Sequence, residues 1–294
     1  MKDITEYLNE DYRDAALYIL YRNTASYIDG LKNAARKVVY VVKKEHLKDT
    51  PVKVSAMASK IVDKAAYLHA DTAAASTVVT MDQSFCGKNN LPVMEAIGNF
   101  GTRFIPEPSA ARYIFTRPQQ AYFDLIYRKE DDVNCTLQEF EGEPIEPMFY
   151  VPTLPMILVN GTDGVGVGFS SSIFPRSVSN MIKAVRASLE GKRLKNEWFK
   201  PHWNGFTGTV ENVDGSWIVS GICTINGKKA LIEELPIGES LDSYIKKLKK
   251  LKADGKIQRY NDYSENDHFK FEVWLSDEES QKDEIKNLIK AEPH

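Results

Sequence analysis

Cysteine is scarce in this 294-residue chain, and long apolar runs are missing. The three cysteines, Cys86, Cys135 and Cys223, are odd in number and far apart. Their distribution argues against a disulfide framework or a zinc site and favours a reducing compartment. No stretch approaches the ~20 apolar residues of a membrane span, and the acidic start MKDITEYLNEDYRD lacks the apolar segment of a signal peptide. We therefore expect a cytoplasmic protein without a membrane partner.

Several common catalytic motifs are also missing. No P-loop lysine follows the glycines of GTDGVGVG, and the five histidines form no HExxH or paired metal spacing. A G-x-S-x-G elbow is absent, and no acidic cluster has the pattern of a self-sufficient magnesium site. These absences exclude the common nucleotide-binding, zinc-hydrolase and serine-hydrolase classes, and they predict no metal site on this chain.

The segment SAARYIFTRP, residues 109–118, places Arg112 directly before Tyr113. A phenol with a pKa near ~10 needs a nearby cation or base before it can act as a nucleophile. An arginine also stabilises the charge of a phosphoryl transition state. Other cations that the fold could bring near are Arg22, Lys32, Arg36 and Lys37. Among fourteen tyrosines, a packed aromatic ring is the ordinary alternative for Tyr113.

The net charge of −3 hides an uneven distribution. Residues 22–117 hold fourteen Lys and Arg against eight Asp and Glu, an excess of +6, whereas the rest of the chain carries −9. The basic part is a candidate electrostatic footprint for phosphates. A solvated surface with a modest basic excess is the alternative.

The first third of the chain reads as helices over residues 12–21, 29–46, 55–68 and 69–82. Ser55 and Asp71 are candidate N-caps for the last two, which a tight link joins into a helix-turn-helix. The fourth helix begins with Thr, Ala and Ser only, so its free N–H groups can approach a phosphate backbone closely. An Ala-rich helix buried against a neighbour is the alternative.

After Gly87 the pattern of the sequence changes. GNFGTRF, residues 98–104, reads as a turn or wing, and MILVN, residues 156–160, as a buried strand followed by a glycine-rich loop. Strand-like alternation covers residues 206–213, 215–227, 229–236 and 268–276, with a basic amphipathic helix over 240–257. The prediction is an α+β fold, with a winged-helix front and an α/β rear.

Taken together, these motifs resemble the breakage-and-reunion region of type IIA DNA topoisomerases (gyrase A, eukaryotic topoisomerase II and viral relatives). The similarity is carried, in order, by YRNTASYIDGLKNAARKVVY, AAYLHADTAAA, GNFGTRF, SAARYIFTR, YVPTLPMILVNGTDGVGVGFSSSIFP and FTGTVE. The resemblance implies an N-terminal arm helix over residues 1–20, a winged-helix (CAP-like helix-turn-helix) cleavage domain over 21–152 and a tower domain over 153–294. Nothing in the sequence reads as the family's coiled coil or C-gate, so we expect a truncated chain, with an unusually short subunit as the alternative.

The resemblance also implies roles for individual residues. Tyr113 would attack a DNA phosphate to give a 5′-phosphotyrosyl link, with Arg112 and Arg22 stabilising the transition state. His69 would hold or polarise the scissile region, with Asn160 close to the same site. Val165 would wedge between base pairs. Residues expected to hold DNA phosphates are Lys32, Arg36 and Lys37.

Partners and cofactors follow from the same resemblance. Mg²⁺ would be bound by a Toprim partner and ATP by an ATPase partner, so the isolated chain would be inactive. A homodimer acting on double-stranded DNA is implied for the full-length enzyme, an ATP-dependent isomerase. The mixture of gyrase-like and eukaryotic features resembles a viral or phage medium subunit, which would place it in the host cytoplasm. The alternative function is a non-catalytic winged-helix DNA-binding module. A tyrosine recombinase is disfavoured because no His has an Arg three places on.

Overall fold

The computed structural model describes residues 3–276 and 282–291, which divide into two compact units. The first unit comprises the chain up to Ser84 with Asn89–Phe100 and Pro108–Phe199. The second comprises Phe85–Lys88, Gly101–Glu107 and the chain from Lys200 onward. The boundary predicted at residue 152 therefore lies inside the first unit.

Four helical segments open the first unit: α1 (Ile4–Tyr7), the π-helical η1 (Leu8–Tyr12), α2 (Arg13–Asn23) and α3 (Asn33–Lys44). The first three follow one another without a break and bury no residue. In α3, four valines are buried and belong to the first core, namely Val38, Val39, Val41 and Val42. No helix in the described ranges has the length and apolarity that a membrane span requires.

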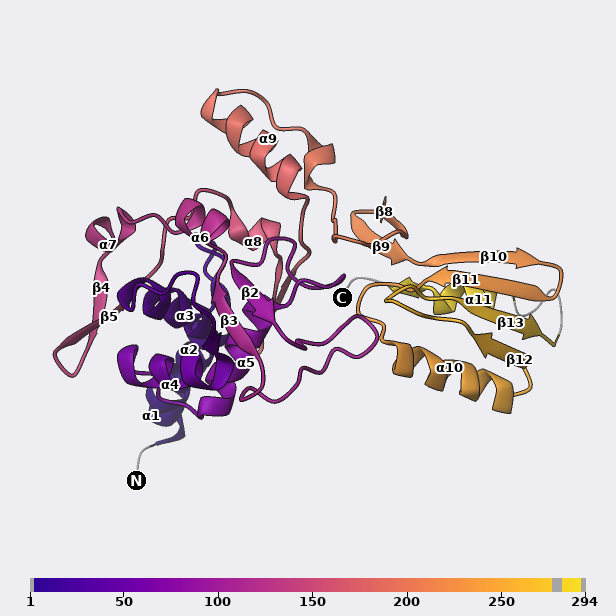
Figure 1. Ribbon diagram of the computed structural model, residues 1–294, viewed down its shortest axis with the longest axis horizontal. Coiled ribbons are helices and arrows are strands. Elements are labelled where there is room, and N and C mark those ends of the chain that lie inside the picture. Colours follow the sequence, from indigo (N-terminus) through magenta and orange to yellow (C-terminus); the bar gives the residue numbers. More distant parts are fainter. Residues whose placement is uncertain (1–2, 277–281, 292–294) are drawn as a thin grey trace. The chain divides into compact units, whose positions relative to one another are not determined.

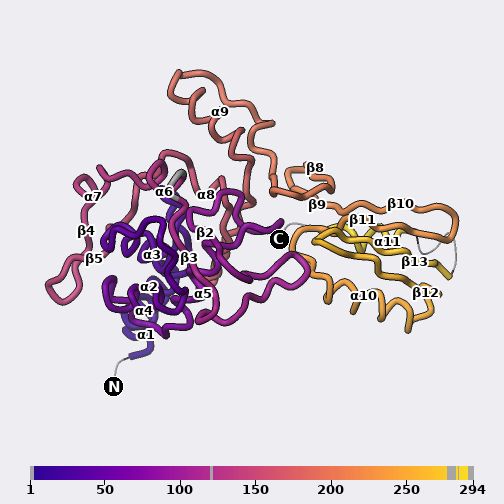
Figure 2. Tube along the Cα trace, in the orientation of Figure 1, coloured from indigo at the N-terminus to yellow at the C-terminus, as the bar shows by residue number. Residues whose placement is uncertain are grey.

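A helix-turn-helix and a small sheet follow, which confirms the predicted winged-helix fold. The helices are α4 (Val54–Lys64) and α5 (Asp71–Asp82), which pack against each other (Figure 2). The antiparallel sheet has the order β1-β3-β2, formed by β1 (Val52–Lys53), β2 (Met94–Ile97) and β3 (Phe115–Pro118).

The N-caps predicted for these two helices are wrong. The N-cap of α4 is Lys53, two residues before the predicted Ser55, and Ala70 stands at the N-cap of α5, so Asp71 is its first helical residue. For α4 the reason is tertiary. The N–H groups of Val54 and Ser55 donate to the carbonyls of Ile114 (3.0 Å) and Ala111 (3.1 Å), so a distant loop satisfies the helix end that a side chain would otherwise cap.

The rest of the first unit is made of short elements. The β4–β5 hairpin projects from it (Figures 1 and 2). Pro155 precedes the run MILVN, which the structure shows as helix α8 with Met156 and Val159 buried, so the predicted strand is wrong. The glycine-rich segment is an antiparallel hairpin of β6 and β7. The bounds are α6 (Gln120–Ile126), α7 (Asp131–Asn134), β4 (Leu137–Phe140), β5 (Glu143–Pro147), α8 (Met156–Val159), β6 (Thr162–Val165), β7 (Ser170–Ile173), α9 (Val178–Leu189) and the 3₁₀ turn η2 (Asn196–Phe199).

The second unit confirms the basic helix and the strand-like segments predicted from alternation, but it also contains strands at Ile257–Asp262 and Lys290–Ala291 that were not predicted. One antiparallel sheet has the order β10-β11-β13-β12 and another the order β14-β9-β8. Helix α10 (Leu241–Ala253) buries Tyr244, Leu248 and Leu251 in the second core, which leaves its many lysines on the other face. The remaining bounds are β8 (Thr209–Val213), β9 (Ser216–Ser220), β10 (Ile222–Asn226), β11 (Lys229–Glu234), β12 (Ile257–Asp262), β13 (Phe271–Leu275), α11 (Lys282–Leu288) and β14 (Lys290–Ala291).

Candidate active site

Tyr113 lies on a turn just before β3, and this turn is hydrogen-bonded to the start of α4. Its N–H donates to the carbonyl of Ala110 (2.8 Å), and the next residue, Ile114, is buried in the first core. The carbonyls of Ala111 and Ile114 accept from the first turn of α4. The backbone on both sides of the tyrosine is thus fixed, yet 65% of the tyrosine is exposed. A packed aromatic role does not fit this exposure.

Arg112 accompanies the tyrosine, as its sequence position predicted. Its guanidinium carbon lies 4.7 Å from the centroid of the Tyr113 ring. A cation over an aromatic face at an exposed site contributes about 0.5–1 kcal/mol. The pair therefore presents a hydroxyl and a guanidinium together on the surface, which is the combination that nucleophilic attack on a phosphate needs.

A second cluster forms around the C-terminal half of α2. The guanidinium carbon of Arg22 lies 5.5 Å from the centroid of the Tyr18 ring, and the Tyr18 hydroxyl is 3.2 Å from His69 Nε2. The His69 ring packs edge-on against Tyr67 at 5.4 Å. Burial raises the pKa of the Tyr67 phenol, and the charge of Arg22 opposes that shift. The structure thus brings Arg22 and His69 into one cluster through Tyr18.

Sequence reasoning missed Tyr18. Its spacing of four residues from Arg22 on a predicted helix places both side chains on one face, and this signal could have found it. Tyr67, two residues before His69, carries no comparable signal.

The β6–β7 hairpin carries Val165 close to the end of α2. The side chain of Asn23 donates to the Val165 carbonyl (3.0 Å), and the Lys32 ammonium donates to the Asp163 carbonyl (2.5 Å). Val165 is 70% exposed although it is apolar. An apolar side chain is thus exposed on an anchored backbone, and its role as a wedge stays a prediction. The Lys32 ammonium, which was predicted to bind a DNA phosphate, forms a hydrogen bond with the backbone of this hairpin.

Arg36 and Lys37, which the resemblance assigns to DNA phosphates, lie inside the protein, and their contact with DNA stays a prediction. Both are buried, at 2% and 6% exposure. Arg36 pairs with Asp29 at 2.8 Å and Lys37 with Glu146 at 2.8 Å. Removing a charge from water is expensive, so buried cations are paired inside the protein. The amphipathic pattern of the helix did not reveal that its cations face inward.

Asn160 makes a structural contact. Its Oδ1 accepts from the Leu91 N–H (2.8 Å) and its Nδ2 donates to the Leu91 carbonyl (3.0 Å). The side chain therefore fixes the backbone before β2. Its catalytic role stays a prediction.

Four of the five predicted catalytic residues thus form two groups, and Asn160 belongs to neither. One is Arg112 with Tyr113, and the other is Arg22 with His69. Among the described residues, no hydrogen bond, ion pair or ring contact joins one group to the other. Each group holds part of the chemistry that the sequence predicted.

Comparison with known proteins finds similarity to DNA topoisomerases, as the sequence motifs predicted. The family of the DNA gyrase/topoisomerase IV A subunit matches residues 22–293. The chain is 31% identical over 298 residues to the mitochondrial DNA topoisomerase 2 of Dictyostelium discoideum, covering 99% of this chain and 23% of that relative. It is 32% identical over 284 residues to DNA topoisomerase 2 of Invertebrate iridescent virus 6, covering 92% of this chain and 24% of that relative.

A solved structure is similar over nearly the whole chain. The Plasmodium falciparum topoisomerase II DNA-binding, cleavage and re-ligation domain superposes with a TM-score of 0.89 at 29% identity. The match covers 98% of this chain and 40% of that one. The chain spans less than a quarter of the length of the two curated relatives above.

Proposed function

Because the chain belongs to the family of the DNA gyrase/topoisomerase IV A subunit, we propose that it is the DNA breakage-and-reunion part of a type IIA topoisomerase. The observation that carries the proposal is the exposed Tyr113 on a turn tied to the helix-turn-helix, with the Arg112 guanidinium over its ring. A winged helix that meets DNA through α5 would bring this turn to the phosphate backbone.

In the proposed reaction the Tyr113 oxygen attacks a DNA phosphorus. The phenol gives up its proton, a P–O bond to tyrosine forms, and the bond from phosphorus to the 3′ oxygen breaks. The 3′ oxygen takes a proton and leaves as a hydroxyl, while the 5′ phosphate stays on the protein. Arg112 would stabilise the charge that develops on the phosphoryl oxygens. Because one phosphoester replaces another, the reverse attack by the 3′ hydroxyl reseals the strand.

The separation of the two groups supports a dimeric active site. Arg22 and His69, joined through Tyr18, would act on the same phosphate as the Tyr113 of a second copy. The exposed Val165, held next to α2 by Asn23, would insert between base pairs and bend the duplex. Under this proposal neither half of the site is sufficient alone.

Metal and nucleotide would come from other polypeptides. Within the described ranges, no three His, Cys, Asp or Glu side chains gather in a way that could hold a metal ion. These residues do not fit a metal site, so no step is assigned to a metal on this chain. We propose that a Toprim partner supplies Mg²⁺, that an ATPase partner supplies ATP for strand passage, and that the assembly works in the cytoplasm, of a host cell if viral.

The test is covalent capture of DNA. The chain is mixed with a Toprim-bearing partner, Mg²⁺ and duplex DNA, and the reaction is stopped with detergent. We expect protein attached to 5′ ends in the unmodified chain and in Tyr122→Phe, which changes another exposed tyrosine. Tyr113→Phe should give no adduct while duplex binding changes less than about twofold.

Two outcomes would contradict the proposal. An adduct that survives Tyr113→Phe would assign the nucleophile elsewhere. Duplex binding without any adduct in the unmodified chain would favour the non-catalytic winged-helix module instead.

A further inference from the structure

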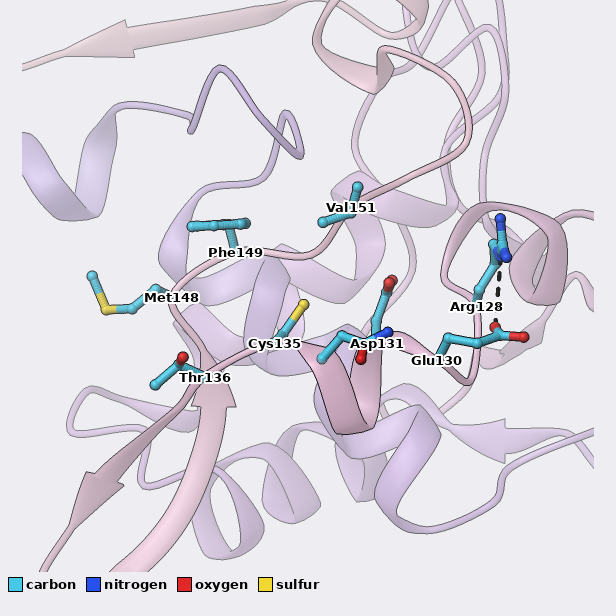
Figure 3. Close-up of a pocket in the computed structure, with 9 residues that line it drawn as sticks. Arg128, Glu130, Asp131, Cys135, Thr136, Met148, Phe149 and Val151 are labelled. Atoms are coloured by element: carbon cyan, nitrogen blue, oxygen red, sulfur yellow. Dashed lines mark ion pairs between the residues drawn. The ribbon is translucent and has the colours of Figure 1, made fainter.

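A cavity of about 490 Å³ lies in the first unit between α7 and the segment that follows β5. This volume is within the range of small-molecule sites. Figure 3 shows Met148, Phe149 and Val151 along one wall and Asp131 and Cys135 along the other. Nothing in the proposed cleavage reaction uses these residues.

Asp131 gives the cavity its chemistry. The residue is only 8% exposed, and its Oδ2 is buried without a hydrogen-bond partner in the described structure. Burial raises the pKa of this carboxyl, although the Lys43 charge and a hydrogen bond from the Val151 backbone oppose the shift. A buried polar atom left without a partner is costly, so it is a candidate for a missing ligand.

The charged side chains next to Asp131 form ion pairs with one another. On one side Glu130 pairs with Arg128 at 3.5 Å, and on the other Asp132 pairs with Lys43 at 2.8 Å. Lys43 also donates to the Arg128 carbonyl (2.7 Å), which uses a second of its protons. Three consecutive carboxylates therefore face two cations. Glu130 and Asp131 both line the cavity, and Asp131 is the one of the three that makes no ion pair in the described structure (Figure 3).

The opposite wall is apolar and open to solvent. Met148 and Val151 are 51% and 52% exposed, and Phe149 is 39% exposed, while Tyr150 between them is buried. Such a wall suits a hydrocarbon or aromatic stem, and the carboxylate suits a cationic head. We propose that this cavity is a binding site for an organic ammonium or guanidinium group carried on an apolar stem.

Affinity measurements on the full chain test the proposal with charged and neutral probes. Phenethylammonium is compared with phenethyl alcohol, and N-acetyl-lysinamide with N-acetyl-norleucinamide, by titration calorimetry. The ammonium of each pair should bind at least about tenfold more tightly, which is about 1.4 kcal/mol. A larger ammonium preference in the first pair would indicate that the natural ligand is a free amine. A larger ammonium preference in the second pair would indicate that it is a lysine side chain of a polypeptide.

Asp131→Asn is the decisive variant because its amide still accepts from the Val151 N–H. It should abolish the preference for ammonium while leaving the alcohol unaffected, whereas the more exposed neighbour variant Asp132→Asn should change each affinity less than about twofold. Met148→Lys, at a half-exposed position, should block ammonium binding by placing its own ammonium in the cavity. This second variant keeps the test valid if Asp131→Asn does not fold.

Cys135 reports where the probe binds. All three cysteines of the chain are free, and Cys135 lines the cavity while Cys86 lies in the other unit. Phenethylammonium should slow alkylation of Cys135 and leave that of Cys86 unchanged. Equal binding of ammonium and alcohol, an unchanged preference in Asp131→Asn, or binding that fails to protect Cys135 would each overturn the proposal.

Discussion

Replacing Asp29 by Ala should destabilise the first unit more than any single surface change. The carboxylate is fully buried. Its Oδ2 accepts from Arg36 Nε (2.8 Å) and the Tyr150 N–H (3.1 Å), and its Oδ1 accepts from the Leu31 N–H (2.9 Å) and Arg36 Nη2 (3.2 Å). Four donors from three separate parts of the chain therefore converge on one side chain.

The magnitude follows from what the substitution leaves behind. Arg36 would keep its bond to the Leu31 carbonyl but would be a buried cation without a counter-charge. Breaking a buried pair from one side costs about 3–5 kcal/mol. The total stability of a domain is about 5–15 kcal/mol, so the loss removes a large share of it.

Urea unfolding combined with hydrogen exchange of the α3 amides would measure this loss in the first unit. The control is Asp14→Ala, which removes a solvent-exposed pair with Arg13 and should cost less than about 1 kcal/mol. The double variant Asp29→Ala with Arg36→Met should be more stable than the sum of the single variants, because no buried charge remains. A loss below about 1 kcal/mol in Asp29→Ala, or simple additivity in the double variant, would refute the reasoning.

Three further predictions concern stability. Burial raises the pKa of Asp82 well above 3.8, so the folded state binds more protons than the unfolded state above that pH and stability falls as pH rises. Asp82→Asn should therefore be more stable than the unmodified chain at pH 7, with the gain shrinking toward pH 4 in unfolding experiments. Gly30→Ala should lower the melting temperature far more than Gly142→Ala. Both glycines have a positive φ, but only at Gly30 would the new Cβ meet backbone, that of Ile157. Met57→Ala should cost about 2–5 kcal/mol in urea unfolding because the side chain is fully buried.

The parts of the fold that depend on local pattern were predictable. Alternating residues identified five strands of the second unit, β8, β9, β10, β11 and β13, but not β12 or β14, and two helical segments joined by a tight link identified α4 and α5. The run MILVN was not decidable, because a short apolar run suits a buried strand and a buried helix equally. The start of α4 depends on the carbonyls of Ala111 and Ile114, which are distant in sequence, so no local signal marks it.

The candidate site also has a part that the local sequence predicts and a part that depends on distant residues. The Arg112–Tyr113 pair needs only a turn to come together, so adjacency predicted it. The roles of Arg36 and Lys37 depend on where the partners Asp29 and Glu146 lie, and Glu146 is more than a hundred residues away. A basic helix next to a turn gave no indication that its cations point into the protein.

The second unit is built from segments that are far apart in the sequence, and this limits where the chain can be cut into fragments. Arg103 belongs to the short segment Gly101–Glu107, yet it pairs with Glu234 at 2.7 Å, and both side chains are buried. Its guanidinium also donates to the Leu235 carbonyl (2.9 Å) and stacks over Phe269. A recombinant fragment that starts at Lys200 would contain the buried Glu234 carboxylate without the Arg103 cation that pairs with it. During synthesis on the ribosome, the ion pair of Arg103 cannot form until Glu234, more than a hundred residues later in the chain, has been made.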